Sequence, residues 1–310
     1  MTKIILVSGC DANYYPMLRE WLHSVRRFAQ SAGMYIGILD AGLTTDQANA
    51  MRMQVNHVVK PDWPTKLPES KTKGKEFLKA CVCRPFLPQI FPGYDIYIWM
   101  DADTWIQNWQ AMELFIQGAA RKKVTLTGQV DRAYPRAGRV KWFGRLAQPR
   151  GFYFSNARKA YGFKKAKDLM PYHVLLAGMF ALHKDAPHWA RWQELVKTTM
   201  TKGKVFTAEQ LSLGIMCYLE GYEYEILPAW THWLCEFKPL WDDKNKSFVE
   251  TYLPHNPLGV LHLSGFDKMR TDRSVTTDFK TTDGREVNLS YRYPYYDGEK
   301  NEEIGTRLAV

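Results

Sequence analysis

The chain has 310 residues, of which 45% are apolar and 14% aromatic, and its formal net charge at pH 7 is +10. This apolar content is enough for one large α/β domain and excludes an intrinsically disordered chain. No segment has the length of a transmembrane helix, and the first apolar run is too short for a signal peptide. The five cysteines lack zinc-ligand spacing, which favours reduced thiols in a cytoplasmic protein.

The first hundred residues alternate between segments typical of strands and segments typical of helices. Strands are expected at residues 3–7, 34–39, 55–59 and 95–100. Helices are expected at residues 14–32, 74–91 and, with Thr44 or Thr45 as N-cap, up to residue 53. The alternation predicts a Rossmann-like α/β fold whose central sheet is mostly parallel, with helices on both faces.

The second half of the chain is less regular. Strands are expected at residues 124–127, 151–155, 174–182 and 260–264, and helices at 187–199 and 207–219. Thr207, followed three residues later by Gln210, is predicted to form a capping box at the start of the last helix. From residue 271 to residue 310 the chain is polar and rich in tyrosine, which is typical of a carboxyl-terminal extension.

The positive charge is concentrated between residues 121 and 172, a segment that contains fourteen Lys and Arg residues but only two Asp residues. Aromatic residues are interleaved with them. The segment could be a solvated insertion, or it could attract an anionic membrane surface, a phosphorylated glycan or nucleic acid. Because no nucleic-acid-binding motif is visible, we do not expect nucleic acid and favour a membrane surface or an anionic acceptor.

Asp101 and Asp103 come directly after the apolar segment 95–100. In open α/β sheets, ligands bind at the carboxyl ends of the strands, and two carboxylates there suit a hard divalent cation. The pair could instead cap the next turn. However, apolar residues on both sides indicate partly desolvated carboxylates, which favours a metal or a basic partner. A metal held there could bind a diphosphate, so the pair predicts a nucleotide-dependent transferase.

Other candidates stand at the ends of predicted elements. Asp11 and Tyr14 follow the first strand and could bind a base or ribose, although Asp11 could simply cap the next helix. Arg84 could brace the carboxylates or contact a sugar, or it could be a surface residue of its helix. His262 ends a late strand and could be a third ligand for Mn²⁺ or a core histidine.

Two further pairs complete the set. Gly265 would let the backbone approach a phosphate, and Lys268 would neutralise a diphosphate as a point charge. Glu209 and Gln210 begin a helix, where they could reach a ligand at the edge of the sheet or serve only as part of the cap.

In this order and spacing, the residues resemble the family 8 glycosyltransferases, retaining GT-A enzymes that include glycogenin and the lipooligosaccharide galactosyltransferases. The resemblance covers most of residues 1–268. It rests on four patterns: Asp11-Ala-Asn13-Tyr14, Arg84 at its spacing before Asp101-Ala102-Asp103, Glu209-Gln210, and His262-x-x-Gly265-x-x-Lys268.

The resemblance implies one GT-A catalytic domain over residues 1–270, followed by the extension at 271–310. It implies transfer of a hexose, with retention, from UDP-glucose or UDP-galactose to a glycan, lipid-linked or protein acceptor. The protein would be cytoplasmic, either free or on the inner face of a membrane.

The resemblance also assigns roles to individual residues. Mn²⁺, or Mg²⁺ in its place, would be bound by Asp101, Asp103 and His262. The nucleotide and donor would be held by Gly9, Asp11, Asn13, Tyr14, Arg84, Ala102, Gly265 and Lys268. The catalytic pair would be Gln210, beside the anomeric carbon, and Glu209.

The chain departs from the family pattern at three places. The central strand has Leu176 where the family usually has Asn, so an amide that contacts the donor sugar is missing. The usual Asp-Gln is Glu209-Gln210, and Lys268 is followed by Met269 rather than Pro-Trp. These changes indicate a divergent member and leave the sugar undetermined.

Two rival functions use the same residues differently. In a haloacid dehalogenase-type phosphatase, Asp101 would be the nucleophile and Asp103 the acid. That pattern requires Thr or Val where this chain has Trp105, and it normally follows the first strand. The other rival is a basic protein that binds nucleic acid or membranes through residues 121–172.

Overall fold

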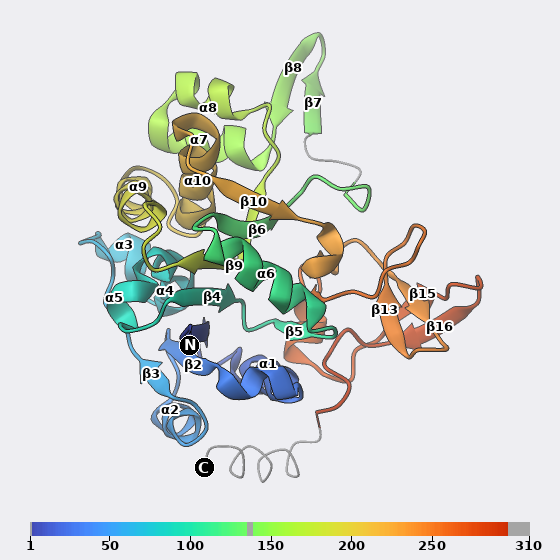
Figure 1. Ribbon diagram of the computed structural model, residues 1–310. Coiled ribbons are helices and arrows are strands. Elements are labelled where there is room, and N and C mark those ends of the chain that lie inside the picture. Colours follow the sequence, from blue (N-terminus) through green and yellow to red (C-terminus); the bar gives the residue numbers. More distant parts are fainter. Residues whose placement is uncertain (1, 135–138, 297–310) are drawn as a thin grey trace.

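The computed structural model describes residues 2–134 and 139–296, and it describes only the backbone for residues 139–143 and 146–150. A seven-stranded sheet forms its centre, with the strand order β10-β6-β9-β4-β1-β2-β3 (Figure 1). Its strands are β1 (Ile4–Cys10), β2 (Tyr35–Asp40), β3 (His57–Val59), β4 (Ile96–Met100), β6 (Val124–Gly128), β9 (Leu175–His183) and β10 (Tyr224–Leu227).

The mostly parallel sheet is confirmed, with one strand reversed. β1 pairs in parallel with β2 and β4, β2 with β3, and β6 with β10. β9 runs antiparallel to both β4 and β6. The carboxyl ends of β1 and β4 therefore meet at one edge of the sheet, and the amino-terminal half of β9 reaches the same edge.

Helices cover both faces of the sheet, and the alternation of side chains along β4 shows why. Tyr97 and Trp99 contribute to the core on one face, and Ile98 and Met100 to the core on the other. The Trp99 face is covered by α7 (Phe152–Tyr161), α9 (His188–Lys202) and α10 (Ala208–Gly214). The opposite face is covered by α1 (Tyr15–Arg26) and α6 (Gln110–Ala120).

The remaining α-helices of the described residues are α2 (Thr45–Arg52), α3 (Glu69–Thr72), α4 (Lys79–Val82), α5 (Leu87–Ile90), α8 (Phe163–Leu169) and α11 (Asp267–Thr271).

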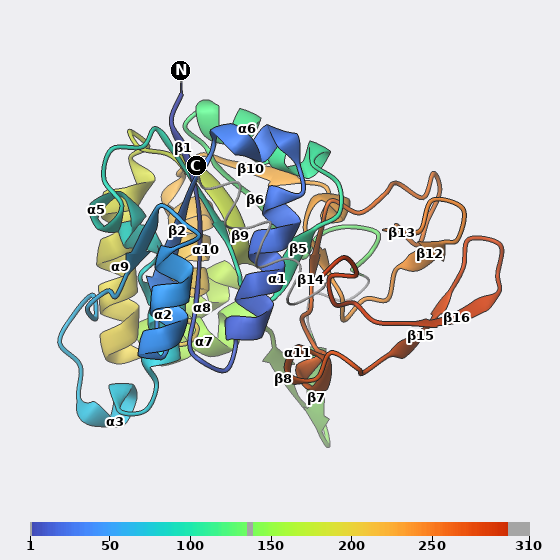
Figure 2. The same ribbon diagram turned by 90° about the horizontal axis from the view of Figure 1, so that it is seen from below.

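A smaller β-rich region lies beside the main sheet (Figure 2). It contains the sheet β11-β14-β5, made of Trp233–Leu234, Val260–His262 and Thr104–Ile106. Two hairpins extend it, β12 (Leu240–Asp242) with β13 (Ser247–Val249) and β15 (Thr277–Lys280) with β16 (Glu286–Leu289). Another hairpin, β7 (Arg139–Phe143) with β8 (Leu146–Arg150), projects from the basic segment.

The segment after residue 270 is packed against this region. Tyr291 and Tyr293 are buried in its core. The Arg292 guanidinium, also buried, donates to both carboxylate oxygens of Glu20 on α1. Residues 297–310 of the predicted extension lie outside the described residues.

Three sequence predictions were wrong. Residues 151–155 begin helix α7 rather than forming a strand, because Tyr153, Phe154 and Ala157 line one helical face that packs into the core. Residues 74–91 form short helical turns rather than one helix, as expected with Pro85 and Pro88 in the interior.

The third wrong prediction is the capping box at Thr207. The Thr207 hydroxyl donates to the Asn156 side chain at 3.2 Å and makes no cap hydrogen bond to its own helix. The α-helical part, α10, ends at Gly214, and the chain continues directly as a π-helical turn over Ile215–Leu219. The cap at Thr44 is confirmed, with Gln47 completing a capping box.

Candidate metal and nucleotide site

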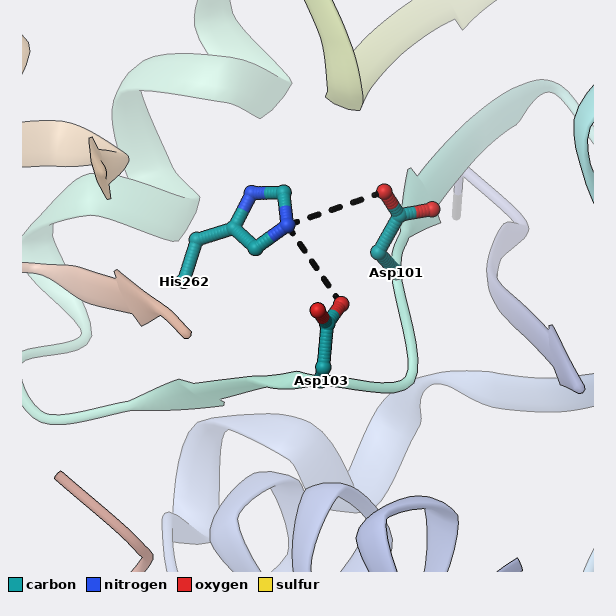
Figure 3. A group of neighbouring side chains, drawn as sticks. All are labelled: Asp101, Asp103 and His262. Atoms are coloured by element: carbon teal, nitrogen blue, oxygen red, sulfur yellow. Dashed lines mark ion pairs between the residues drawn. The ribbon is translucent and has the colours of Figure 1, made fainter. Parts of the chain in front are cut away.

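Strand pairing brings the three predicted metal ligands together. Asp101 follows β4, and its backbone N–H donates to the Gly178 carbonyl on β9 at 2.8 Å. Asp103 precedes β5, and β5 pairs antiparallel with β14, whose last residue is His262. His262 Nε2 lies 3.4 Å from Asp103 Oδ1 and 3.9 Å from Asp101 Oδ2 (Figure 3).

The residues fit a divalent cation. One ligand atom from each of Asp101, Asp103 and His262 can be chosen so that all three lie within 4.8 Å of one another. Two carboxylate oxygens and an imidazole nitrogen are a donor set that suits Mn²⁺, and Mg²⁺ less well because Mg²⁺ prefers oxygen. The geometry therefore agrees with the predicted ligand set.

A second histidine, His232, orients the first. His232 Nε2 lies 3.0 Å from His262 Nδ1, and the two rings stack with centroids 5.1 Å apart. On its other side, His232 Nδ1 lies 3.0 Å from the Thr127 hydroxyl. Complete burial lowers the pKa of His232, so the ring is neutral. A neutral His232 can accept the proton of His262 Nδ1 and donate to Thr127, which leaves His262 Nε2 as the ring atom that can bind a metal beside the carboxylates.

Asp101 is held by groups from the Trp99 face of the sheet. Its Oδ1 accepts hydrogen bonds from the Arg84 guanidinium and, at 2.9 Å, from the Trp99 indole. Arg84 also donates to the Ala177 carbonyl at 2.7 Å and to Glu209 Oε1 at 3.0 Å. Burial raises the pKa of Asp101 and raises that of Glu209 to about 8, because the one guanidinium that they share offsets only part of the cost of desolvating both carboxylates.

Asp103 has a different cationic partner, Arg270 of α11. Arg270 Nη2 lies 2.8 Å from Asp103 Oδ2, and the Tyr14 hydroxyl is hydrogen-bonded to the same guanidinium. Burial alone would raise the pKa of Asp103, but His262 and Arg270 outweigh it and hold the pKa well below its usual range. The Arg270 Nε is buried and has no hydrogen-bond partner. Such an orphaned donor has capacity for a ligand.

The charge of the triad depends on its protonation. With its pKa raised to about 8, Glu209 is mostly neutral at neutral pH, so Asp101 and Asp103 are the ionised carboxylates beside the Arg84 and Arg270 guanidinium groups. Burial alone would lower the pKa of His262, but Asp103 and Asp101 outweigh it and raise the pKa. A divalent cation at the triad would take the place of the proton on His262 Nε2.

The triad forms part of the wall of a cavity of about 580 Å³. This volume is in the range of small-ligand sites. The other predicted site residues that line the cavity are Gly9, Asp11, Tyr14, Arg84, Ala102, Glu209 and Gln210. The structure therefore brings most of the predicted residues together around one space, at the edge where β1 and β4 end.

Three predicted residues do not line the cavity. Asn13 is exposed, and its side chain donates to Asp11 Oδ2 at 3.1 Å. Gly265 adopts a φ of +79°, which glycine tolerates and other residues rarely adopt. Lys268 is exposed on α11 and does not line the cavity, whereas Arg270, two residues later, does.

Two cavity residues also have structural roles. A Cβ on Gly9 would lie 2.7 Å from the Leu39 Cβ, so Gly9 is required for close packing of β1 on β2. Asp11 Oδ1 accepts from the backbone N–H groups of Asn13 and Tyr14, each at 3.2 Å, and so closes the turn that precedes α1. The N-cap position of α1 itself is Tyr14 and has no side-chain cap hydrogen bond. Asp11 also lines the cavity, so a role in this turn is compatible with ligand binding.

Sequence reasoning missed Arg270 and His232. Arg270 lies only two residues beyond the predicted Lys268, and Arg273 follows it. The sequence therefore places three cationic side chains near the predicted diphosphate but does not indicate which of them contacts it. His232 lies 30 residues before His262 and stands in an irregular segment. No spacing pattern links the two histidines.

Comparisons with known proteins show similarity of fold only. No protein-family model matches the chain, and no curated protein matches it in sequence. Among solved structures, the WbbM bifunctional glycosyltransferase superposes with a TM-score of 0.52 at 13% identity, over 85% of this chain and 46% of that one. The present chain thus spans about half of WbbM.

A second structure matches over most of its own length. An active-site mutant of LgtC superposes with a TM-score of 0.50 at 13% identity, over 84% of this chain and 87% of that one. The shared features are a large, mostly parallel central sheet with helices on both faces. The chain therefore has the GT-A fold found in these glycosyltransferases.

Proposed function

We propose that the chain is a metal-dependent glycosyltransferase that moves a hexose from a UDP-sugar to a glycan, lipid-linked or protein acceptor, with retention. One observation carries the proposal: the triad of Asp101, Asp103 and His262 forms part of the wall of a large cavity at the carboxyl edge of the sheet. The fold, shared with WbbM and LgtC, supports it.

The triad would bind Mn²⁺, with Mg²⁺ as the alternative. A divalent ion at this position would stabilise negative charge on the diphosphate leaving group. His232 keeps the His262 ring in the orientation and tautomer that a ligand requires. Arg84 and the Trp99 indole donate to Asp101 Oδ1, so the other oxygen, Oδ2, is the one next to His262.

The nucleotide would occupy the part of the cavity lined by Asp11 and Tyr14. Arg270 joins this part to the triad, since it contacts both Tyr14 and Asp103. We therefore assign the main diphosphate contact to Arg270 and only long-range attraction to the exposed Lys268. On binding, the diphosphate would replace Asp103 as a partner of the guanidinium and would reach its orphaned Nε.

The donor sugar would lie beside Gln210, which is half-buried on the cavity wall. Glu209 is bound to Arg84 and positions that arginine, so Gln210 is the residue free to approach the anomeric carbon. Its side-chain carbonyl would stabilise positive charge there. As the acceptor hydroxyl attacks, the bond to the diphosphate breaks with its electron pair on UDP. The hydroxyl proton passes to a departing phosphate oxygen.

UDP-glucose and UDP-galactose are the donors we propose. The cavity wall carries Leu176 where the family resemblance leads one to expect an amide. The donor sugar would therefore meet an apolar contact at this point, and the amide's hydrogen bond would be absent.

We place the enzyme in the cytoplasm, free or at the inner face of a membrane. In the part of the chain that the structure describes, no helix has the length and apolarity needed to cross a bilayer. The positive residues between 121 and 172 support contact with an anionic surface.

Release of UDP from each donor tests the proposal. UDP-glucose and UDP-galactose are incubated with the protein in Mn²⁺ or in EDTA, and UDP is quantified. We expect slow metal-dependent hydrolysis of one donor, lost in Asp103→Asn and strongly reduced in Gln210→Ala. Near-normal turnover by Gln210→Ala would remove the role given to that residue. Metal-independent release would contradict the metal site.

A further inference from the structure

A second cavity, of about 390 Å³, adjoins the first. Its walls come from α3, α7 and the loop between α9 and α10, which gather on the side of the molecule away from the β12–β13 and β15–β16 hairpins (Figure 1). Four lysines line it, and no carboxylate does: Lys71, Lys75, Lys159 and Lys204. We call it the lysine cavity. An anionic ligand suits such a space.

The four lysines differ in what they can still bind. The Lys71 ammonium donates to the carbonyls of Met200, Thr201 and Gly203 at 2.7–3.1 Å, so its three donors are used to hold the end of α9. The Lys75 ammonium donates once, to the Ser70 carbonyl at 2.9 Å.

Lys159 and Lys204 are different. Both are exposed, and neither has a hydrogen bond or ion pair with the described residues. Lys71 thus contributes charge, whereas Lys75, Lys159 and Lys204 have donors available for a ligand. Two elements far apart in the sequence, α7 and the α9–α10 loop, supply the two lysines without partners.

Two phenylalanines connect the lysine cavity to the triad cavity. Phe77 and Phe206 line both spaces. They are 45% and 66% exposed, and of the exposed large apolar side chains in the described residues they are the two that line these cavities. Apolar side chains exposed together beside a cleft are a feature of ligand-binding grooves. A sugar ring can pack its C–H face on them while its polar groups remain hydrated.

We propose that the acceptor is a phosphorylated sugar, with its phosphate in the lysine cavity and its ring on Phe77 and Phe206. This placement would direct the far side of the ring into the triad cavity, where the donor sugar would lie. The inference rests on the proposed glycosyltransferase function, because it names the acceptor for that reaction. It leaves the donor contacts unchanged.

Ligand titration tests the inference with the donor site already filled. The protein is saturated with UDP and Mn²⁺, so that the Arg270 region is occupied, and glucose 6-phosphate, glucose and inorganic phosphate are then titrated by calorimetry. We expect saturable binding of glucose 6-phosphate, weaker binding of phosphate, and none of glucose. The double variant Lys159→Ala/Lys204→Ala should weaken binding of glucose 6-phosphate by at least about tenfold, since charged hydrogen bonds are lost.

A matched control separates a site from general attraction. Lys164→Ala/Lys167→Ala removes two exposed lysines from the neighbouring helix α8, neither of which lines the lysine cavity. The net charge changes equally in both variants. Equal weakening by the two double variants, or no weakening by Lys159→Ala/Lys204→Ala, would overturn the proposal. In addition, Phe206→Ala should weaken glucose 6-phosphate more than inorganic phosphate.

The same titration separates failure of this inference from failure of the proposed function. If UDP binds with Mn²⁺ but glucose 6-phosphate does not bind, only the acceptor proposal is wrong. If UDP does not bind, the glycosyltransferase proposal is wrong. The lysine cavity is then titrated without nucleotide, and lysine-dependent binding would still support a sugar phosphate site there.

Discussion

Arg270, rather than Lys268, should control the affinity for the diphosphate. Both residues lie on the five-residue helix α11, so Arg270→Ala and Lys268→Ala remove one positive charge from the same element. Arg270 lines the triad cavity and contacts Asp103 and Tyr14, whereas Lys268 is exposed and does not line it. We expect Arg270→Ala to weaken UDP binding far more than Lys268→Ala.

The magnitude follows from what the Arg270 guanidinium exchanges on binding. At an effective dielectric constant of 20, unit charges about 4 Å apart attract by about 4 kcal/mol. Arg270 already has this attraction to Asp103 in the free protein, so the diphosphate gains only the difference. Hydrogen bonds to charged groups contribute about 1.5–3 kcal/mol net, which corresponds to about 10- to 150-fold in Kd. For the exposed Lys268 we expect less than about threefold.

The metal alone should respond in the opposite direction. Without Arg270, Asp103 loses a cation that competes for its Oδ2, so Mn²⁺ should bind Arg270→Ala more tightly than the wild type when no nucleotide is present. Calorimetry measures UDP binding in saturating Mn²⁺, and electron paramagnetic resonance of free Mn²⁺ measures the metal alone. Equal loss of UDP affinity in Lys268→Ala, or unchanged UDP affinity in Arg270→Ala, would refute the reasoning.

Three further predictions address other parts of the molecule. His232→Phe preserves a ring that can stack on His262 but removes the hydrogen bond, so Mn²⁺ affinity should fall about 10- to 100-fold; unchanged affinity would mean that His232 does not orient the ligand. Glu209 has a folded-state pKa of about 8, above its unfolded value, so its contribution to stability is fully present below about pH 4.5 and is lost as the pH rises through 8. Urea unfolding in EDTA should therefore show that, as the pH rises from about 4.5 to 8, the free energy of unfolding falls more steeply for the wild type than for Glu209→Gln. Parallel pH profiles for the two proteins would count against a raised pKa of Glu209. Glu20→Ala removes the carboxylate partner of the buried Arg292 guanidinium, which then keeps only its hydrogen bonds to the Met269 and Arg270 carbonyls, and should lower the free energy of unfolding by about 3–5 kcal/mol. A change below about 1 kcal/mol in urea denaturation would show that the contact contributes little.

Strand ends were the parts of the site that could be predicted from the sequence. An apolar strand segment fixes where Asp101 emerges, because its side chains must alternate between two cores and its end must lie at the edge of the sheet. His262 ends a short strand for the same reason, and the pairing of β14 with β5 then places it beside Asp103.

The orientation of α11 could not be predicted in this way. Lys268 and Arg270 are two positions apart, so a helix of five residues directs them to different sides, and packing of Met269 decides which one faces the cavity.

Local propensity also gave the wrong prediction at residues 151–155, where a strand was expected and a helix begins. Aromatic residues favour strands in general, but the contacts that bury Tyr153 and Ala157 against α9 and α10 exist only in the folded protein.

The lysine cavity is likewise a product of tertiary structure. Lys159 and Lys204 are separated by 45 positions, and each looks like an ordinary surface residue in its own segment. Only packing of α7 beside the α9–α10 loop brings the two ammonium groups to one space. The net charge of residues 121–172 indicated an anionic partner without indicating where it would bind.

Metal-dependent nucleotide binding tests the proposed function most directly. Calorimetric titration of UDP is carried out in Mn²⁺ and in EDTA, on the wild type and on Asp103→Asn. We expect UDP to bind the wild type only with Mn²⁺, and to bind Asp103→Asn weakly or not at all under either condition. UDP binding of equal strength in Mn²⁺ and EDTA, or no binding in either, would contradict a metal-assisted diphosphate site at Asp101, Asp103 and His262.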